Sequence, residues 1–138
     1  MRRQRRIDTA PELALRRAVH ALGLRYRVDY PLPVGGVRRR ADLAFPALRI
    51  AVFVDGCFWH RCPIHATYPR ANAQWWEDKL NANAARDQNT DARLAEVNWV
   101  AFRVWEHEDA RESAERLRSL VRTRREQLAK PPRFKNGE

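Results

Sequence analysis

Both cysteines of this 138-residue chain and two of its four histidines lie within nine residues, between Cys57 and His65. Their spacing is C-x4-C-x2-H, inside a segment, 56–70, that also contains two prolines and little that could pack as a core. Zn²⁺ binds thiolate and imidazole in tetrahedral geometry, and such a cluster is typical of a zinc site. We therefore predict a loop organised by zinc. A Cys57–Cys62 disulfide, or two unrelated buried thiols, is the alternative.

A structural zinc site needs a fourth ligand from elsewhere in the chain. His107 follows a predicted strand at 99–105 and is the best candidate. Such a site would tie the loop to the end of a distant strand and stabilise a region without a core of its own. The predicted zinc ligands are Cys57, Cys62, His65 and His107.

The charge balance predicts the partner. The chain has 27 Lys and Arg against 17 Asp and Glu, a net charge of +10. This excess favours a polyanion, with nucleic acid first and an anionic membrane surface second. Two cysteines argue against a secreted disulfide scaffold, the apolar run 50–54 is too short to span a membrane, and no apolar segment of a signal peptide follows the basic residues 1–6. We expect a cytoplasmic protein.

The length and the pattern of elements predict one α/β domain over 1–138, with a basic N-terminal arm at 1–8 and a disordered tail at 130–138. Helical periodicity, capping signals and alternating apolar residues mark the elements. The region 72–97 is predicted as two helices or one helix bent around 79–83. The predicted order is a helix at 11–22, strands at 26–30, 41–45 and 48–54, helical structure at 72–97, a strand at 99–105 and a helix at 110–128. This order favours helices packed on a small mixed sheet.

Three carboxylates can converge in such a fold. Asp42 begins one predicted strand and Asp55 ends the next, so a hairpin would bring them to one end of the sheet. Glu12 joins them if the first helix packs beside the sheet. Clustered carboxylates repel one another unless a cation lies between them, and Mg²⁺ prefers oxygen ligands. His60 remains after the zinc assignment as a candidate general base or acid. The alternative is plain surface acids and a packing histidine.

Several aromatic residues lie near His60 in the sequence or in the predicted helical region that follows it. Phe58 and Trp59 lie beside His60, and Trp75 and Trp76 are adjacent, so one helix cannot bury both on a narrow stripe. Exposed rings in a basic protein favour stacking on bases or wedging between base pairs. Packing of these rings between the loop and the helix is the equal alternative.

Together these motifs resemble the very short patch repair (Vsr) DNA mismatch endonuclease family. The resemblance rests on VFVDGCFWHRCPIH, preceded by RADLAF and followed by WWEDKLNANAARD and FRVWEHE, with DTAPE at the first helix. It implies a fold similar to type II restriction endonucleases of the PD-(D/E)xK type. It also implies nicking of duplex DNA 5′ of the T in a T:G mismatch, which arises when 5-methylcytosine deaminates, and the start of excision repair at that nick.

The resemblance also assigns roles to residues. Asp42 matches the acidic Mg²⁺ ligand, and Val54 matches a position whose backbone carbonyl binds the same metal. Glu12 matches a catalytic acid and His60 a histidine that helps to activate the attacking water. Cys57 and His107 match zinc ligands. The matched DNA-facing residues are the aromatic wedge of Phe58, Trp59 and Trp76, the helix positions Lys79 and Asn83, and the nearby acid Asp87.

The sequence departs from the family at Asp55, where the best-known member has a histidine. Asp55 would become a further Mg²⁺ ligand or orient His60. The zinc ligand types differ as well, since the best-known member uses more cysteine, and the N-terminal arm is short. The expected cofactors are catalytic Mg²⁺ and structural Zn²⁺. The expected partners are mismatched double-stranded DNA and mismatch-repair proteins, for a monomer in the bacterial cytoplasm that associates with the nucleoid when bound to DNA.

Two other functions stay open at this point. One is a related restriction or defence nickase that does not need a mismatch, and the Asp55 departure keeps it open. The other is a non-catalytic, zinc-stabilised DNA-binding module, which the charge and the aromatic residues fit equally well. The constellation of Asp42, Asp55 and His60 argues against the second, because a protein that only binds DNA does not need it.

Overall fold

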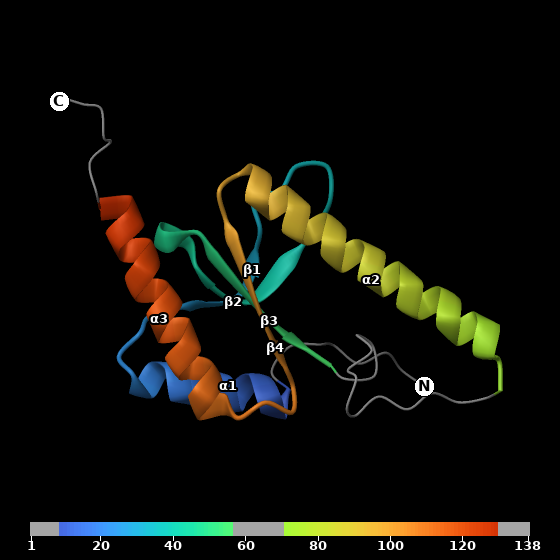
Figure 1. Cartoon of the computed structure of the whole chain (residues 1–138), viewed down its shortest axis with the longest axis horizontal. Coiled ribbons are helices and arrows are strands. Elements are labelled where there is room, and N and C mark those ends of the chain that lie inside the picture. The colour runs from blue at the N-terminus through green and yellow to red at the C-terminus, as the bar shows by residue number, and fades with distance from the viewer. Residues whose placement is uncertain (1–8, 57–70, 130–138) are drawn as a thin grey trace.

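A computed structural model describes residues 9–56 and 71–129 of the chain (Figure 1). It contains three α-helices, four strands and one short 3-10 turn in this part. The elements are α1 (Ala10–Ala21), β1 (Arg27–Pro31), β2 (Arg40–Phe45), η1 (Pro46–Leu48), β3 (Ile50–Asp55), α2 (Ala73–Glu96), β4 (Val100–Trp105) and α3 (Ala110–Ala129). The expected order of helices and strands is confirmed.

The four strands form one mixed sheet in the order β1-β2-β3-β4. β1, β2 and β3 pair antiparallel, and η1 makes the tight connection from β2 to β3. β4 returns parallel to β3 after the crossover through α2, with Asp55 opposite Trp105 at the last pair. A parallel pair needs such a long connection. The carboxyl ends of β3 and β4 therefore lie side by side.

The sheet separates two apolar clusters. On one face, α1 and α3 pack together on the inner strands, with Leu15, Val19, Ile50, Leu117 and Val121 at the centre. On the other face, the last turns of α2 cover small residues of the sheet through Leu94. Figure 1 places α1 and α3 together on one side of the central strands and α2 on the other. This is the predicted sandwich of helices on a small mixed sheet.

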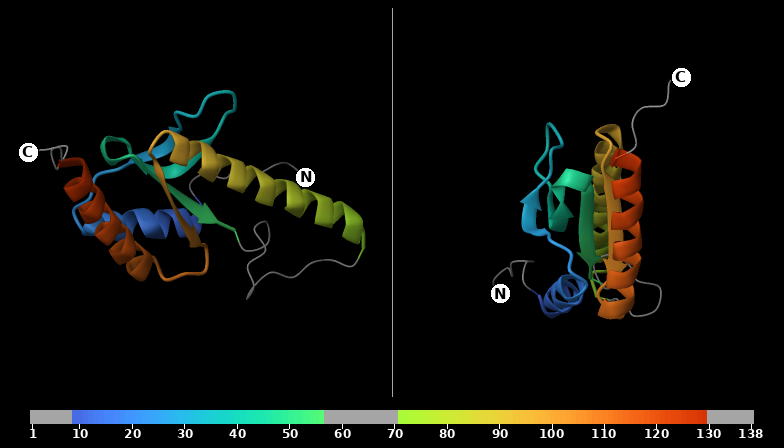
Figure 2. Two further views of the ribbon diagram at one scale, coloured as in Figure 1. Left: turned by 45° about the horizontal axis from the view of Figure 1, so that its top comes forward. Right: turned by 90° about the vertical axis from the view of Figure 1, so that its left-hand side faces the viewer.

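α2 is one uninterrupted helix of 24 residues. Of the two predictions for this region, two separate helices or one bent helix, the first is therefore wrong. It contains no Gly or Pro that would break it. It ends where Asn98 takes a left-handed conformation (φ 64°) and the N–H of Trp99 bonds to the carbonyl of Leu94 at 2.8 Å. Its first turns extend well beyond the sheet (Figure 2), and most of their residues are exposed.

The arm at 1–8, the loop at 57–70 and the tail at 130–138 lie outside the described residues, so the predictions for them stay predictions. Among the helices that are described, none combines the length and the apolar character needed to cross a bilayer.

Candidate active site

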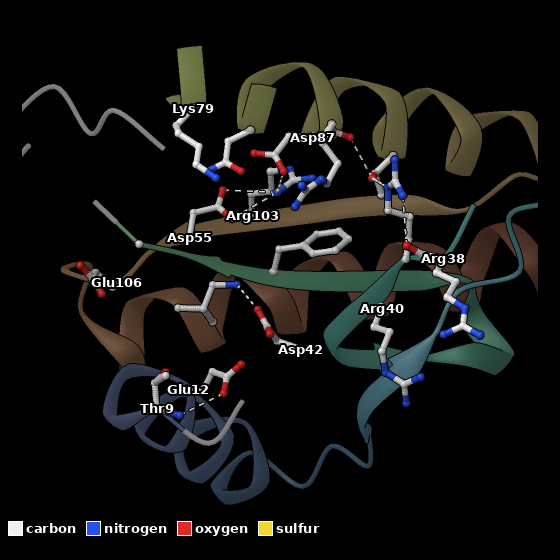
Figure 3. A pocket seen from close by; sticks show the side chains of 17 residues that line it. Thr9, Glu12, Arg38, Arg40, Asp42, Asp55, Lys79, Asp87, Arg103 and Glu106 are labelled. Atoms are coloured by element: carbon white, nitrogen blue, oxygen red, sulfur yellow. Dashed lines mark hydrogen bonds and ion pairs between the residues drawn. The ribbon is translucent and has the colours of Figure 1, made fainter. Parts of the chain in front are cut away.

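A pocket of about 560 Å³ opens between the start of α1, the start of β2, the end of β3 and the middle of α2 (Figure 3). Acidic and basic side chains dominate its lining. The acidic lining residues are Glu12, Asp42, Asp55, Asp87 and Glu106, and the basic ones are Arg38, Arg39, Arg40, Lys79, Arg86 and Arg103. The sequence prediction that the three carboxylates of Glu12, Asp42 and Asp55 share one region is therefore confirmed.

Glu12 is held in place by the start of its own helix. Its Oε1 accepts a hydrogen bond from the backbone N–H of Thr9 at 3.1 Å, the contact by which the glutamate of a capping box reaches back to the N-cap residue. Arg16, one turn later, lies 3.8 Å from the same oxygen. Glu12 is only 3 % exposed, an unusual degree of burial for a glutamate. The local sequence thus fixes a carboxyl group at the pocket wall.

Asp42 faces Glu12 from β2. Its Oδ2 accepts a hydrogen bond of 2.7 Å from the backbone N–H of Val54 on the neighbouring strand. Burial raises the pKa of Asp42 to about 8, and a hydrogen bond with Glu12 and the charges of Glu12 and Asp55 add to the rise, while the Val54 N–H opposes it. The pair therefore keeps a proton near neutral pH, because two adjacent buried carboxylates resist ionising together.

Asp55, at the end of β3, is paired with a cation. Nη1 of Arg103 lies 3.2 Å from its Oδ1 and 3.4 Å from its Oδ2. Arg103 extends from β4 across the ring of Phe53, with 4.2 Å from the guanidinium carbon to the ring centre. It also contacts Asp91 at 2.8 Å and Asp87 at 3.9 Å on α2. Arg103 thus links the ends of the central strands to α2.

The donors at Glu12 and Asp42 suit a divalent cation. No three His, Cys, Asp or Glu side chains within 9–56 and 71–129 are grouped closely enough to hold a metal ion without other donors. Mg²⁺, however, keeps several waters and is commonly bound by one or two carboxylates. Burial and the neighbouring carboxyl groups of Glu12 and Asp55 raise the pKa of Asp42, so they oppose a second negative charge there. A cation between the two groups would relieve that opposition.

The structure brings the predicted helix residues to the same pocket. Lys79, Asn83 and Asp87 of α2 all line it. Trp76, the predicted wedge residue on this helix, is half-buried and does not line the pocket. It meets the ring of Trp75 edge-on at 4.7 Å. Lys79 Nζ lies 5.4 Å from the ring centre of Trp75.

His107 is exposed in the turn after β4, and its ring stacks on Trp105 at 6.4 Å. The preceding residue, Glu106, lies beside Gly56, where the first described segment ends. This position is compatible with a ligand that meets the loop beginning at residue 57. The other predicted zinc ligands and three further predicted site residues fall outside the described residues: Cys57, Cys62, His65, Phe58, Trp59 and His60.

Sequence reasoning missed the basic side of the pocket. Arg103 could not be identified from the sequence, because a single arginine in a predicted strand fits an exposed position as well as a position in a pocket. The run Arg38-Arg39-Arg40 was visible as charge but could not be placed against α2. Glu106 was not predicted as a site residue, although it directly precedes the predicted zinc ligand His107. A polar residue at the carboxyl end of each parallel strand was the available signal for Glu106.

Known proteins resemble the chain along most of its length. A family model described as DNA mismatch endonuclease Vsr matches residues 1–65. The chain is 45 % identical to the Type II nicking enzyme V.NaeI of Lentzea aerocolonigenes over 82 % of this chain and 69 % of that protein. It is 36 % identical to V.XorIIP of Xanthomonas oryzae pv. oryzae over 88 % of each. Identity to the DNA mismatch endonuclease Vsr of Escherichia coli is 35 %, over 72 % of this chain and 62 % of that protein.

Proposed function

The chain belongs to the Vsr family and is a DNA-nicking endonuclease, and on that premise we propose that it nicks one strand of duplex DNA 5′ of the T in a T:G mismatch. Such a nick would start the repair of a deaminated 5-methylcytosine. The observation that carries the proposal is the buried Glu12–Asp42 pair, set in a pocket whose other side is basic. An acidic centre for the reacting phosphate beside cations for the flanking phosphates is what hydrolysis of a nucleic-acid backbone requires.

The proposed Mg²⁺ ligands are Asp42 and the backbone carbonyl of Val54, with Glu12 or Asp55 as a further donor. When bound there, Mg²⁺ would supply a Lewis acid for the scissile phosphate and would neutralise charge on the leaving 3′ oxygen. The hydrogen bond from the Val54 N–H fixes the orientation of Asp42 before any ligand arrives. Preorganised charge of this kind needs no rearrangement during the reaction.

The remaining chemistry is assigned to His60, which would accept a proton from the attacking water or hold that water in line. Glu12 is buried and anchored by the Thr9 N–H, so it would offer its carboxyl oxygens at a fixed position. Asp55 is held by Arg103 and would either share the metal or set the orientation of His60. Structural Zn²⁺ on Cys57, Cys62, His65 and His107 would hold the loop that presents His60.

Selectivity for the mismatch would come from deformation of the duplex. A T:G pair stacks poorly, so insertion of aromatic side chains beside it costs less than at a matched pair. Phe58, Trp59 and Trp76 are the proposed wedge. Lys79 and Asn83 lie on the same helix as Trp76 and line the pocket, so the residues proposed to face the mismatched bases stand beside the acidic pair.

The test compares nicking rates on three duplexes of one sequence that differ at a single base pair: T:G, T:A and C:G. Each is incubated with added Mg²⁺ and without it, for the wild type and for Asp42→Asn. Mg²⁺-dependent nicking of the T:G duplex alone, absent in Asp42→Asn, supports the proposal. Equal rates on all three duplexes would identify a nickase with other targeting, and binding without cleavage would leave only a DNA-binding module.

A further inference from the structure

The loop between β1 and β2 is fixed to α2 by two arginines. Arg39 donates from Nε to Thr90 Oγ1 at 2.8 Å and from Nη2 to Asn89 Oδ1 at 3.3 Å. Arg93 of α2 reaches back and donates to the carbonyl of Gly35 at 2.6 Å. The loop is thereby held against the helix beside the pocket. A rigid loop presents its side chains with less loss of conformational entropy on binding than a free one.

Three consecutive arginines, Arg38 and Arg39 of this loop and Arg40 at the start of β2, differ in what they contact. Arg39 is used to hold the loop. Arg40 turns toward β1, where its guanidinium binds the side chain of Asp29 at 2.8 Å and the carbonyl of Asp29 at 2.6 Å. Arg38 offers only its backbone carbonyl, which accepts from Arg39. Its exposed guanidinium has no hydrogen bond or ion pair to any residue that the structure describes.

A second guanidinium without a partner lines the same pocket from α2. Arg86 is exposed, and its backbone carbonyl accepts from Thr90 while its side chain has no partner within the described segments. The other cations of the pocket are engaged: Arg103 by Asp55, Asp87 and Asp91, and Lys79 by the ring of Trp75. Counting only partners within 9–56 and 71–129, Arg38 and Arg86 are the two pocket arginines whose guanidinium groups bind no other residue.

The ligand that fits them follows from charge and position. Figure 3 shows the side chains of Glu12 and Asp42 on one side of the pocket and those of Arg38 and Arg40 on the other. An extended anion bound in the pocket would place one part beside the carboxyl groups and another part beside the guanidinium groups. A planar guanidinium matches a phosphate through two parallel hydrogen bonds. A chain of regularly spaced phosphates fits both points, and a single small anion does not.

We propose that Arg38 and Arg86 form a phosphate-binding pair that holds the DNA backbone beside the scissile phosphate. This inference rests on the proposed function, because DNA supplies the phosphates that the two arginines would bind. It acts from two elements, the β1–β2 loop and α2, which Arg39 and Arg93 keep at a fixed separation. Its contribution is independent of base identity, because phosphates carry no sequence information.

The test measures the salt dependence of binding to a short matched duplex by fluorescence anisotropy, without added Mg²⁺. Each phosphate contact contributes about 0.9 to the slope of log Kobs against log salt concentration. The double variant Arg38→Gln with Arg86→Gln should therefore lower the magnitude of the slope by about 1.8. The matched control is Arg122→Gln with Arg125→Gln, which removes two exposed arginines from α3 on the opposite face of the sheet. The control should leave the slope within about 0.5 of the wild-type value.

An unchanged slope in the double variant would overturn the phosphate-binding pair, and so would an equal fall in the control, because net charge alone would then explain both. Thermal unfolding of both variants checks that they fold, and both pairs are exposed. If the slopes differ as expected while no duplex is nicked, the inference stands and the proposed function fails. If the wild type does not bind duplex DNA, both fail.

Discussion

The guanidinium of Arg103 on β4 holds the carboxylate of Asp55 at the end of β3, with Nη1 3.2 Å from Oδ1. The same guanidinium contacts Asp91 and Asp87 on α2, so one cation serves three carboxylates from two elements. Burial lowers the pKa of Arg103, but the hydrogen bond to Asp91 and the charges of Asp55, Asp91 and Asp87 outweigh it and raise the pKa above its usual value. Arg103 is therefore charged near neutral pH.

Replacing this cation should destabilise the fold. Arg103→Met would leave Asp55, Asp87 and Asp91 without their shared partner, and we expect a loss of about 2 kcal/mol in the free energy of unfolding. Urea denaturation measures it. The matched control is Arg118→Met, whose ion pair with Glu115 lies at the surface of α3 and should be worth less than about 1 kcal/mol. Equal losses in both variants would show that the network around Arg103 is a weak surface contact.

The fold was largely predictable because its signals are local. Thr9 and Glu12 mark the start of α1, alternating and continuous apolar runs mark the strands, and Gly23 marks the end of α1. The proximity of Glu12 to Asp42 was also predictable, on the condition that the first helix packs beside the sheet. The continuity of α2 could not be predicted, because Leu80 is the one large apolar residue between Lys79 and Asn83, and a single residue does not distinguish a bent helix from a straight one.

The network around Arg103 could not be predicted, because it depends on relations that no local pattern contains. The parallel register places Arg103 opposite Phe53, and the rotation of α2 turns Asp87 and Asp91 toward it. The same holds for Arg38 and Arg86, which become neighbours of one pocket only when the β1–β2 loop lies on α2. Charge counts predicted a nucleic-acid partner but not which arginines remain available to it.

The pKa of Asp42 predicts how stability depends on pH. It is about 8 in the folded protein against 3.8 as the reference value, so the folded state holds this proton more tightly than the unfolded chain. The resulting stabilisation is fully present below about pH 4 and is lost as the pH rises through 8. Urea midpoints of the wild type should therefore fall from pH 5 to pH 8.5 more than those of Asp42→Asn. Parallel curves for the two proteins would mean that Asp42 is ionised in the folded state throughout this range.

Mg²⁺ dependence separates the roles of the carboxylates. If Asp55 contributes to the proposed metal site, Asp55→Asn should raise the Mg²⁺ concentration for half-maximal nicking about tenfold. Asp91→Asn is the control, because Asp91 also binds Arg103 but does not line the pocket. It should leave the Mg²⁺ requirement close to that of the wild type. An equal increase in both variants would show that Asp55 acts only through Arg103.

The zinc prediction is tested by metal content. Elemental analysis of the purified protein should find one zinc per chain, and His107→Ala or Cys62→Ser should release it. His20→Ala is the control, since His20 is an exposed residue of α1 far along the sequence from the cluster. Full zinc content in the His107→Ala protein would remove His107 from the predicted ligand set. No zinc in the wild type would favour the disulfide or free-thiol alternative for the two cysteines.

The most direct test of the central proposal maps the cut on a duplex with one T:G mismatch, each strand labelled in turn at its end. The wild type with Mg²⁺ should give a single product, from the T strand, that ends directly 5′ of the mismatched T. The strand with the G should stay intact, and so should both strands of the matched duplex. Cuts in both strands, or the same cut in the matched duplex, would contradict the assignment of this endonuclease to T:G mismatch repair.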